Sequence, residues 1–178
     1  MFWILRGVTF LANHQERYEK HRDLLGENVR GNVEEAAKMT AHEIGWANAE
    51  QTRLYRDFQR FFDDIDLLIC PAAAIPPFPV EQLYCAEIDG VKLPNYISWL
   101  DITSAITLTG HPVAVVPCGY EPTGTPFGLQ IVGPRRHSDA SVIAAAAALE
   151  TAFAADPDLA RPVPDIAALT GVAQNSRS

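Results

Sequence analysis

The sequence predicts an α/β fold, and three observations support that prediction. Over residues 10–62, apolar side chains recur at helical spacings of three and four. A short apolar run at 66–70 ends at Pro71, which is typical of a buried strand. Two more apolar runs, 113–117 and 127–132, flank a segment rich in turn formers. Helix and strand patterns therefore share one chain of 178 residues, the length of an ordinary domain.

Three helices are expected in the N-terminal part, over residues 10–25, 28–38 and 40–62. The third has the clearest start. Thr40 and Glu43 have the spacing of a capping box, in which the hydroxyl accepts the third backbone N–H and the carboxylate reaches back to the first residue. We therefore expect the helix to begin at Thr40.

The middle of the chain is predicted to leave regular structure. Residues 71–79 are rich in proline, which lacks the N–H donor that a helix or central strand needs, so an extended loop is expected there. Residues 80–95 are interpreted as a loop with polar turns. A helix is then expected over most of residues 96–109, ending at Gly110.

The C-terminal part is predicted to form a β-hairpin and one helix. The apolar runs at 113–117 and 127–132 flank the turn-forming joint and should pair antiparallel. Ser138 is expected to cap a helix over residues 139–154. The buried stripe of that helix would comprise Val142, Ile143, Ala146, Leu149 and Phe153.

Charge and cysteine content limit the classes of function. The formal net charge of −8 repels phosphate backbones, so no nucleic-acid partner is expected. Three cysteines at positions without metal-like spacing favour a reducing, cytoplasmic compartment. The apolar start over residues 1–12 is interrupted by Arg6 and has no cleavage site, so neither a signal peptide nor a membrane span is predicted.

The order of motifs resembles the closing part of the amidase-signature family of serine hydrolases. The resemblance covers roughly residues 10–155 and comprises a D-L-L-x-x-P block, a G-x-P block before a strand, a G-x-P-x-G-x-Q block and a glutamate near the end of the last helix. The matching residues are Asp66, Leu67, Leu68 and Pro71, then Gly110, Pro112, Val116, Pro117 and Gly119, then Gly124, Pro126, Gly128, Leu129, Gln130 and Gly133, and finally Glu150.

The resemblance implies a fold and a place within it. The family fold is a mixed β-sheet with helices on both faces, of which this chain would supply the C-terminal part. Residues 1–178 would then form a single partial domain, with an irregular tail over 156–178.

The resemblance also implies a chemistry, the hydrolysis of amides by two serines and a lysine base. In the family these residues come earlier in the sequence. The lysines here are Lys20, Lys38 and Lys92, and none is followed by the Gly/Ser-rich loop that would hold an oxyanion. None of the six serines has the glycine-flanked turn that exposes a nucleophile. We therefore predict no catalytic residue in this chain, and no amidase activity from the chain alone.

Five residues are candidates for the wall of a substrate pocket. Ala72, next to Ala73, stands where the family commonly has threonine, and Thr107 stands where it commonly has asparagine. Both departures would alter the pocket wall or its hydrogen bonding. Tyr96 and Trp99 form an aromatic pair that either packs in the core or lines the acyl pocket, and core packing is favoured.

Three weaker patterns have structural explanations that are favoured over functional ones. Cys118 with His111 or His137 could form a thiol–imidazole pair, but a buried cysteine and two loop histidines are favoured because nothing local orients a base. The aspartates within 63–66 are interpreted as solvated rather than metal-binding. His42 begins half of a metal-binding helix motif whose second histidine is absent. No metal and no cofactor are predicted.

Two functions of different class remain open. In the first, the chain is part of an amidase, and its partners are a small amide substrate and either the missing N-terminal amidase part or further copies of itself. In the second, it is a stand-alone, non-catalytic binding or assembly module derived from an amidase. An enzyme with a new site is a third and weaker alternative. The sequence leaves the substrate amide open.

Overall fold

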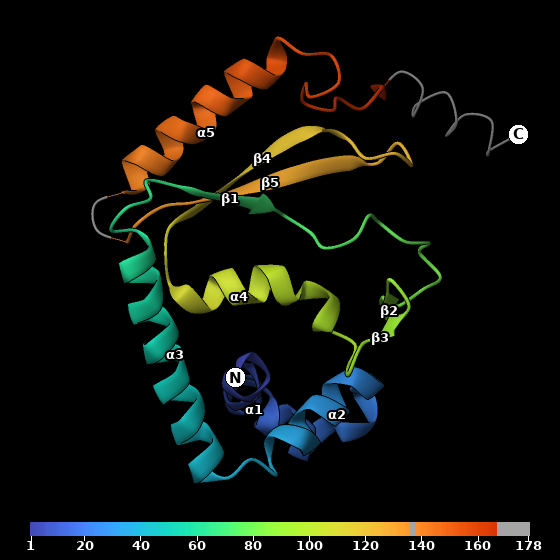
Figure 1. Ribbon diagram of the computed structural model, residues 1–178. Helices are drawn as coiled ribbons and strands as arrows, with labels where there is room; N and C mark the ends of the chain where they lie inside the picture. The colour runs from blue at the N-terminus through green and yellow to red at the C-terminus, as the bar shows by residue number, and fades with distance from the viewer. Residues whose placement is uncertain (136–137, 167–178) are drawn as a thin grey trace, which may run out of the picture. The chain divides into compact units, whose positions relative to one another are not determined.

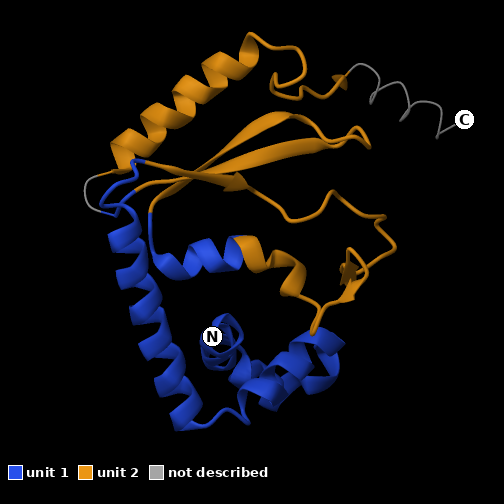
Figure 2. Ribbon diagram, viewed as in Figure 1, with its two compact units in different colours: residues 1–66, 103–111, 134–136 blue, residues 67–102, 112–133, 137–178 orange. Residues whose placement is uncertain are grey.

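The structure is a computed structural model, and it describes residues 1–135 and 138–166. The chain divides into two compact units (Figure 2). Unit 1 comprises the described parts of residues 1–66, 103–111 and 134–136. Unit 2 comprises those of 67–102, 112–133 and 137–178. Within the described residues, no helix is long and apolar enough to cross a membrane.

Unit 1 is built mainly from α1 (Phe2–His21), η1 (Arg22–Leu24), α2 (Glu27–Ala36) and α3 (Ala41–Phe61) (Figure 1). Helix α1 packs against both α2 and α3. A Cβ at Gly7 would lie 2.5 Å from the Met39 side chain, so the absence of a side chain there permits this close packing. Helix α1 begins eight residues before the expected start, which means that the apolar N-terminal segment is helical.

The start of α3 confirms the predicted capping box. The Thr40 hydroxyl accepts the Glu43 backbone N–H at 3.2 Å, and the Thr40 backbone N–H donates to the Glu43 carboxylate at 2.8 Å. The same unit contains the end of α4 (Asp101–Thr109), which follows η2 (Ser98–Leu100) of unit 2. Gly110 ends α4 in the left-handed region, with φ of +64°, as the sequence predicts.

Unit 2 contains a three-stranded sheet in the order β1–β5–β4, formed by β1 (Leu68–Pro71), β4 (Val113–Tyr120) and β5 (Pro126–Val132) (Figure 1). Strands β4 and β5 pair antiparallel, with Val113 opposite Val132, which confirms the predicted hairpin. Strand β1 also pairs antiparallel with β5. The described strands therefore pair only antiparallel, and a mixed sheet remains an expectation for the complete family fold.

Helix α5 (Asp139–Ala154) packs against β4 and β5. Its position explains why residue 133 is glycine, because a Cβ there would lie 2.4 Å from Val142 Cγ2. Val142 is buried as predicted, whereas Ile143 is 66% exposed, so the expected stripe is wrong at that position. Ser138 occupies the N-cap position of α5 as predicted, but it has helical dihedral angles and its side chain makes no capping hydrogen bond, so the expected cap interaction is wrong.

The segment expected as a loop over residues 80–95 contains a small hairpin, β2 (Glu87–Ile88) with β3 (Val91–Lys92). Asp89 and Gly90 both have positive φ, 49° and 79°, which is the geometry of a two-residue hairpin turn. The expected tail over 156–178 lies outside the described residues from position 167 on. The prediction of a single partial domain stays a prediction.

Candidate functional site

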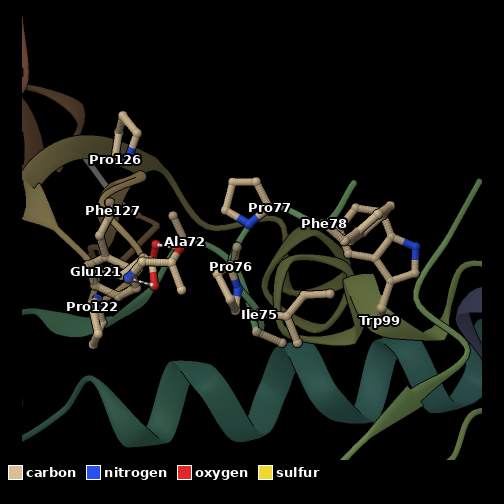
Figure 3. A pocket seen from close by; sticks show the side chains of 14 residues that line it. Ala72, Ile75, Pro76, Pro77, Phe78, Trp99, Glu121, Pro122, Pro126 and Phe127 are labelled. Atoms are coloured by element: carbon tan, nitrogen blue, oxygen red, sulfur yellow. Dashed lines mark hydrogen bonds between the residues drawn. The ribbon is translucent and has the colours of Figure 1, made fainter. Parts of the chain in front are cut away.

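Unit 2 contains a pocket of about 870 Å³ that is open to solvent (Figure 3). Residues 72–78, which follow β1, form one wall. Residues 121–123 and 126–128, from the β4–β5 hairpin, form another, and Trp99 lies on η2. Pockets of roughly 300–1,000 Å³ with mostly apolar walls are typical of small-molecule sites. This pocket is therefore the best candidate for a ligand site within unit 2.

The start of the 72–78 wall is fixed to the sheet by hydrogen bonds. The Ala72 backbone N–H donates to the Gly128 carbonyl at 2.8 Å, which extends the β1–β5 ladder by one bond. The Gln130 side chain, which is 4% exposed, donates its amide to the Pro71 carbonyl at 2.9 Å. Beyond this anchor the prolines at 76, 77 and 79 prevent regular structure, so the chain continues as an extended wall.

An aromatic pair forms one end of the pocket (Figure 3). The rings of Phe78 and Trp99 meet edge to face, with centroids 5.4 Å apart and planes at 83°. The Trp99 indole N–H donates to the Tyr96 carbonyl at 3.1 Å. The Asn95 carboxamide oxygen accepts the Ile97 backbone N–H at 3.1 Å, which fixes the turn before η2. Local hydrogen bonds therefore orient the indole in the pocket wall.

Glu121 is the only ionisable residue among the described residues that line the pocket. Its carboxylate accepts the backbone N–H groups of Thr123 at 2.9 Å and of Thr125 at 3.0 Å, and also both threonine hydroxyls. The hydroxyl bonds from Thr123 and then Thr125 lower the pKa of Glu121 to about 2. The carboxylate is thus ionised at neutral pH and is used to hold the hairpin turn.

The structure brings together three of the five candidate pocket residues, Ala72, Ala73 and Trp99. Tyr96 is not in the lining; its ring lies 6.1 Å from that of Tyr84, and its carbonyl holds the Trp99 indole. Thr107 lies on the part of α4 that belongs to unit 1 and is exposed there. Of the aromatic pair, Trp99 lines this pocket and Tyr96 is half-buried outside it, and an acyl-pocket role for either stays a prediction.

The other eleven residues of the fourteen in the lining were not among the predicted pocket residues, and they include Ile75, Phe78, Glu121 and Phe127. The proline-rich stretch marked the segment containing the first two, since a long extended loop beside a strand is a common place for a binding wall. No sequence signal distinguished Glu121 or Phe127 from ordinary residues of a hairpin.

The structure describes the surroundings of His111 and of Cys118, each within its own unit. Within unit 1, the His111 Nδ1 lies 2.9 Å from the Thr109 carbonyl oxygen, so this nitrogen carries the hydrogen, and Nε2 accepts from the Gln59 amide at 2.8 Å. Both ring nitrogens are thus used, and burial lowers the pKa of His111. Cys118 is a half-buried free thiol in unit 2. His137 lies outside the described residues.

The three lysines are exposed, and Ser98 is buried and hydrogen-bonded. Lys20 pairs with Glu16 of its own helix, and Lys38, two residues beyond the end of α2, pairs with Glu35 of that helix. Lys92 is exposed on β3, and the buried Ser98 hydroxyl donates to Asn95 at 3.1 Å. Among the residues that the structure describes, no three His, Cys, Asp or Glu side chains are grouped so as to hold a metal ion.

A family model described as Amidase matches residues 10–143. The chain belongs to the amidase family. An acylamidase from Rhodococcus erythropolis is 33% identical over 138 residues, which make up 72% of this chain and 28% of that protein. A glutamyl-tRNA(Gln) amidotransferase subunit from Thermosynechococcus vestitus is 37% identical over 87 residues, 49% of this chain and 17% of the other.

Solved amidase structures have the same fold over most of this chain. A bacterial aryl acylamidase of the amidase-signature family superposes with a TM-score of 0.70 at 28% identity, covering 87% of this chain and 32% of that one. A second amidase superposes with a TM-score of 0.75 at 22% identity, covering 84% and 34%. The chain thus corresponds to between about a sixth and a third of the length of these relatives.

Proposed function

We propose that this chain is the C-terminal portion of an amidase-signature hydrolase that cleaves carboxylic amide C–N bonds, and that its catalytic serines and lysine are supplied from outside these 178 residues. The observation that carries the proposal is the family match over residues 10–143, combined with a span of 28% of the related acylamidase. A part of that size can supply walls of a site without supplying its chemistry.

The resemblance indicates which chemistry the remainder would supply. A neutral lysine would accept a proton through a bridging serine, so that the second serine can attack the amide carbonyl. Backbone N–H groups of a Gly/Ser-rich loop would stabilise the oxyanion. The pairing of Lys20 and Lys38 with glutamates, and the exposure of Lys92, support the view that this chain provides no such base.

The role proposed for this chain is to form part of the substrate pocket. Ala72, Ala73 and Trp99 would contact the substrate directly. Tyr96 would act through its carbonyl, which holds the Trp99 indole. Thr107 remains a predicted pocket residue whose contact would depend on the complete fold. The partners are then a small amide and either the remaining amidase part or another copy of this chain.

Two assays test this function. The purified chain should release no ammonia from aliphatic or aromatic amides, and turnover that a single serine or Cys118 substitution abolishes would contradict the proposal. In the second assay, residues 10–143 replace the matched segment of the Rhodococcus erythropolis acylamidase. The chimera should hydrolyse its acylamide substrate, and a chimera without the acylamidase's own catalytic serine should not. A folded chimera with no activity would count against the proposed role.

One observation favours the alternative of a stand-alone binding module. Every residue that lines the pocket belongs to unit 2, so no residue from elsewhere is needed to form it. The binding module would be supported over the hydrolase if the chain binds ligands through this pocket while the folded chimera is inactive.

A further inference from the structure

We infer that the pocket of unit 2 binds the uncharged aromatic part of an amide substrate. That the ligand is a substrate rests on the proposed function, but the binding preference follows from the pocket itself. Three features carry it: rigid apolar walls, an edge-to-face aromatic pair at one end, and a carboxylate that already accepts four hydrogen bonds from the hairpin turn.

The pocket is apolar and largely preformed. Four of its lining residues are prolines, Pro76, Pro77, Pro122 and Pro126, whose rings fix the backbone φ angle. Ile75 lies between the two ends of the pocket (Figure 3). A volume of about 870 Å³ accommodates a ring with a short chain. Because the walls need little ordering, a ligand that fills them loses little affinity to rearrangement of the protein.

The aromatic end favours a ring over an alkyl chain. The Phe78 and Trp99 rings already meet edge to face, and both line the same pocket. A ligand ring can continue this arrangement, because aromatic quadrupoles favour offset and edge-to-face contacts. The Trp99 N–H is bonded to the Tyr96 carbonyl, so the indole offers the ligand mainly its apolar surface.

The Glu121 carboxylate at the other end of the pocket disfavours a ligand ring that carries a charged group. Four donors from Thr123 and Thr125 converge on the Glu121 carboxylate. An anionic ligand would be repelled by this carboxylate. A cationic ligand would have to leave water for apolar walls, and the Glu121 carboxylate, which already accepts four hydrogen bonds, would offset only part of that desolvation. An uncharged ring is neither repelled by the carboxylate nor penalised by the desolvation of a charge.

Binding can be measured on the 178-residue chain without any catalysis. In a Trp3→Phe, Trp46→Phe background, Trp99 is the remaining tryptophan and its emission reports on the pocket. The probe is 4-phenylbutyramide, compared with its cyclohexyl analogue and with analogues that carry a carboxylate or a trimethylammonium group on the ring.

The neutral aromatic probe should change the Trp99 emission saturably. We expect it to bind about threefold more tightly than the cyclohexyl analogue, as edge-to-face contacts permit, and at least about tenfold more tightly than either charged analogue. Equal or tighter binding of a charged analogue, or no saturable change with the neutral probe, would overturn the inference.

A matched pair of substitutions locates the site. Ile75→Arg places a guanidinium in the pocket wall, and Val80→Arg places the same group five residues later, at a position that is 91% exposed and outside the lining. Ile75→Arg should weaken binding of 4-phenylbutyramide by at least about tenfold, and Val80→Arg should leave it unchanged. Circular dichroism and thermal melting must show both variants folded. Equal binding by both folded variants would refute the location.

The outcome separates this inference from the proposed function. An active chimera together with a chain that does not distinguish neutral from charged rings would refute the inference alone. An inactive folded chimera together with selective binding by the chain would refute the hydrolase role and leave the binding preference standing.

Discussion

Gly133 lies where α5 approaches the sheet, and substituting it tests how closely the two are packed. A Cβ at this position would lie 2.4 Å from Val142 Cγ2 and 3.3 Å from the Ser138 hydroxyl. Val142 is 2% exposed and β-branched, so in a helix its side chain has essentially one rotamer and cannot turn away. Gly133→Ala therefore forces α5 or the strand to shift.

The expected magnitudes follow from these contacts. Overpacking of this kind costs about 1–3 kcal/mol of unfolding free energy. Val142→Ala removes two buried methyl groups, which at ~0.8 kcal/mol each plus a cavity contribution amounts to about 2 kcal/mol. In the double variant the methyl group introduced at position 133 occupies the space that Val142 vacates. We therefore expect a loss smaller than the sum of the two, with a coupling of about 1–2 kcal/mol.

The wild-type chain, Gly133→Ala, Val142→Ala and the double variant form a double-mutant cycle, and their unfolding in urea is followed by circular dichroism. Gly45→Ala serves as a control, because a Cβ there has no neighbour within 4 Å and the residue lies inside α3; it should stabilise the helix by about 1 kcal/mol. The contrary result is a double variant whose destabilisation equals the sum of the two single destabilisations within about 0.5 kcal/mol. In that case Gly133 and Val142 are not in contact, and the described packing of α5 on the sheet is wrong.

Three further predictions concern the stability and association of the two units. Burial lowers the pKa of His111 below its ordinary 6.5, so as the pH falls the unfolded chain binds the proton before the folded chain does. The free energy of unfolding should therefore be greatest above pH 6.5 and fall as the pH drops from there toward the folded-state pKa. His111→Gln should reduce this pH dependence, measured by urea titrations at several pH values. Thr40→Ala removes the capping box and should cost about 1 kcal/mol in thermal unfolding, whereas unchanged stability would show that α3 does not need its cap. Among the strands that the structure describes, β4 lies at the edge of its sheet, and its Val115 is 59% exposed. This edge should promote self-association visible by light scattering at micromolar concentration, and Val115→Lys should reduce it; a wild-type chain that stays monomeric would contradict this.

The sequence by itself was informative where the signal is local. The Thr40–Glu43 capping box, the left-handed Gly110 and the pairing of 113–117 with 127–132 depend on residues close together in the chain, so spacing alone predicts them. The ordered motif blocks likewise indicated the family, which the match over 10–143 establishes. The expected start of α1 was wrong because an apolar N-terminal segment without a capping pattern gives no boundary signal.

Burial and the pocket were decided by tertiary structure. Ile143 and Val142 are equally apolar neighbours, and only the approach of α5 to Gly133 determines that Val142 is the buried one. Ala72 and Glu121 are far apart in the sequence, and they line one pocket because β1 pairs with β5 across about sixty residues. Hydrophobic periodicity reports which face of an element is apolar but not which distant strand it will meet, so the residue types were visible in the sequence while their assembly was not.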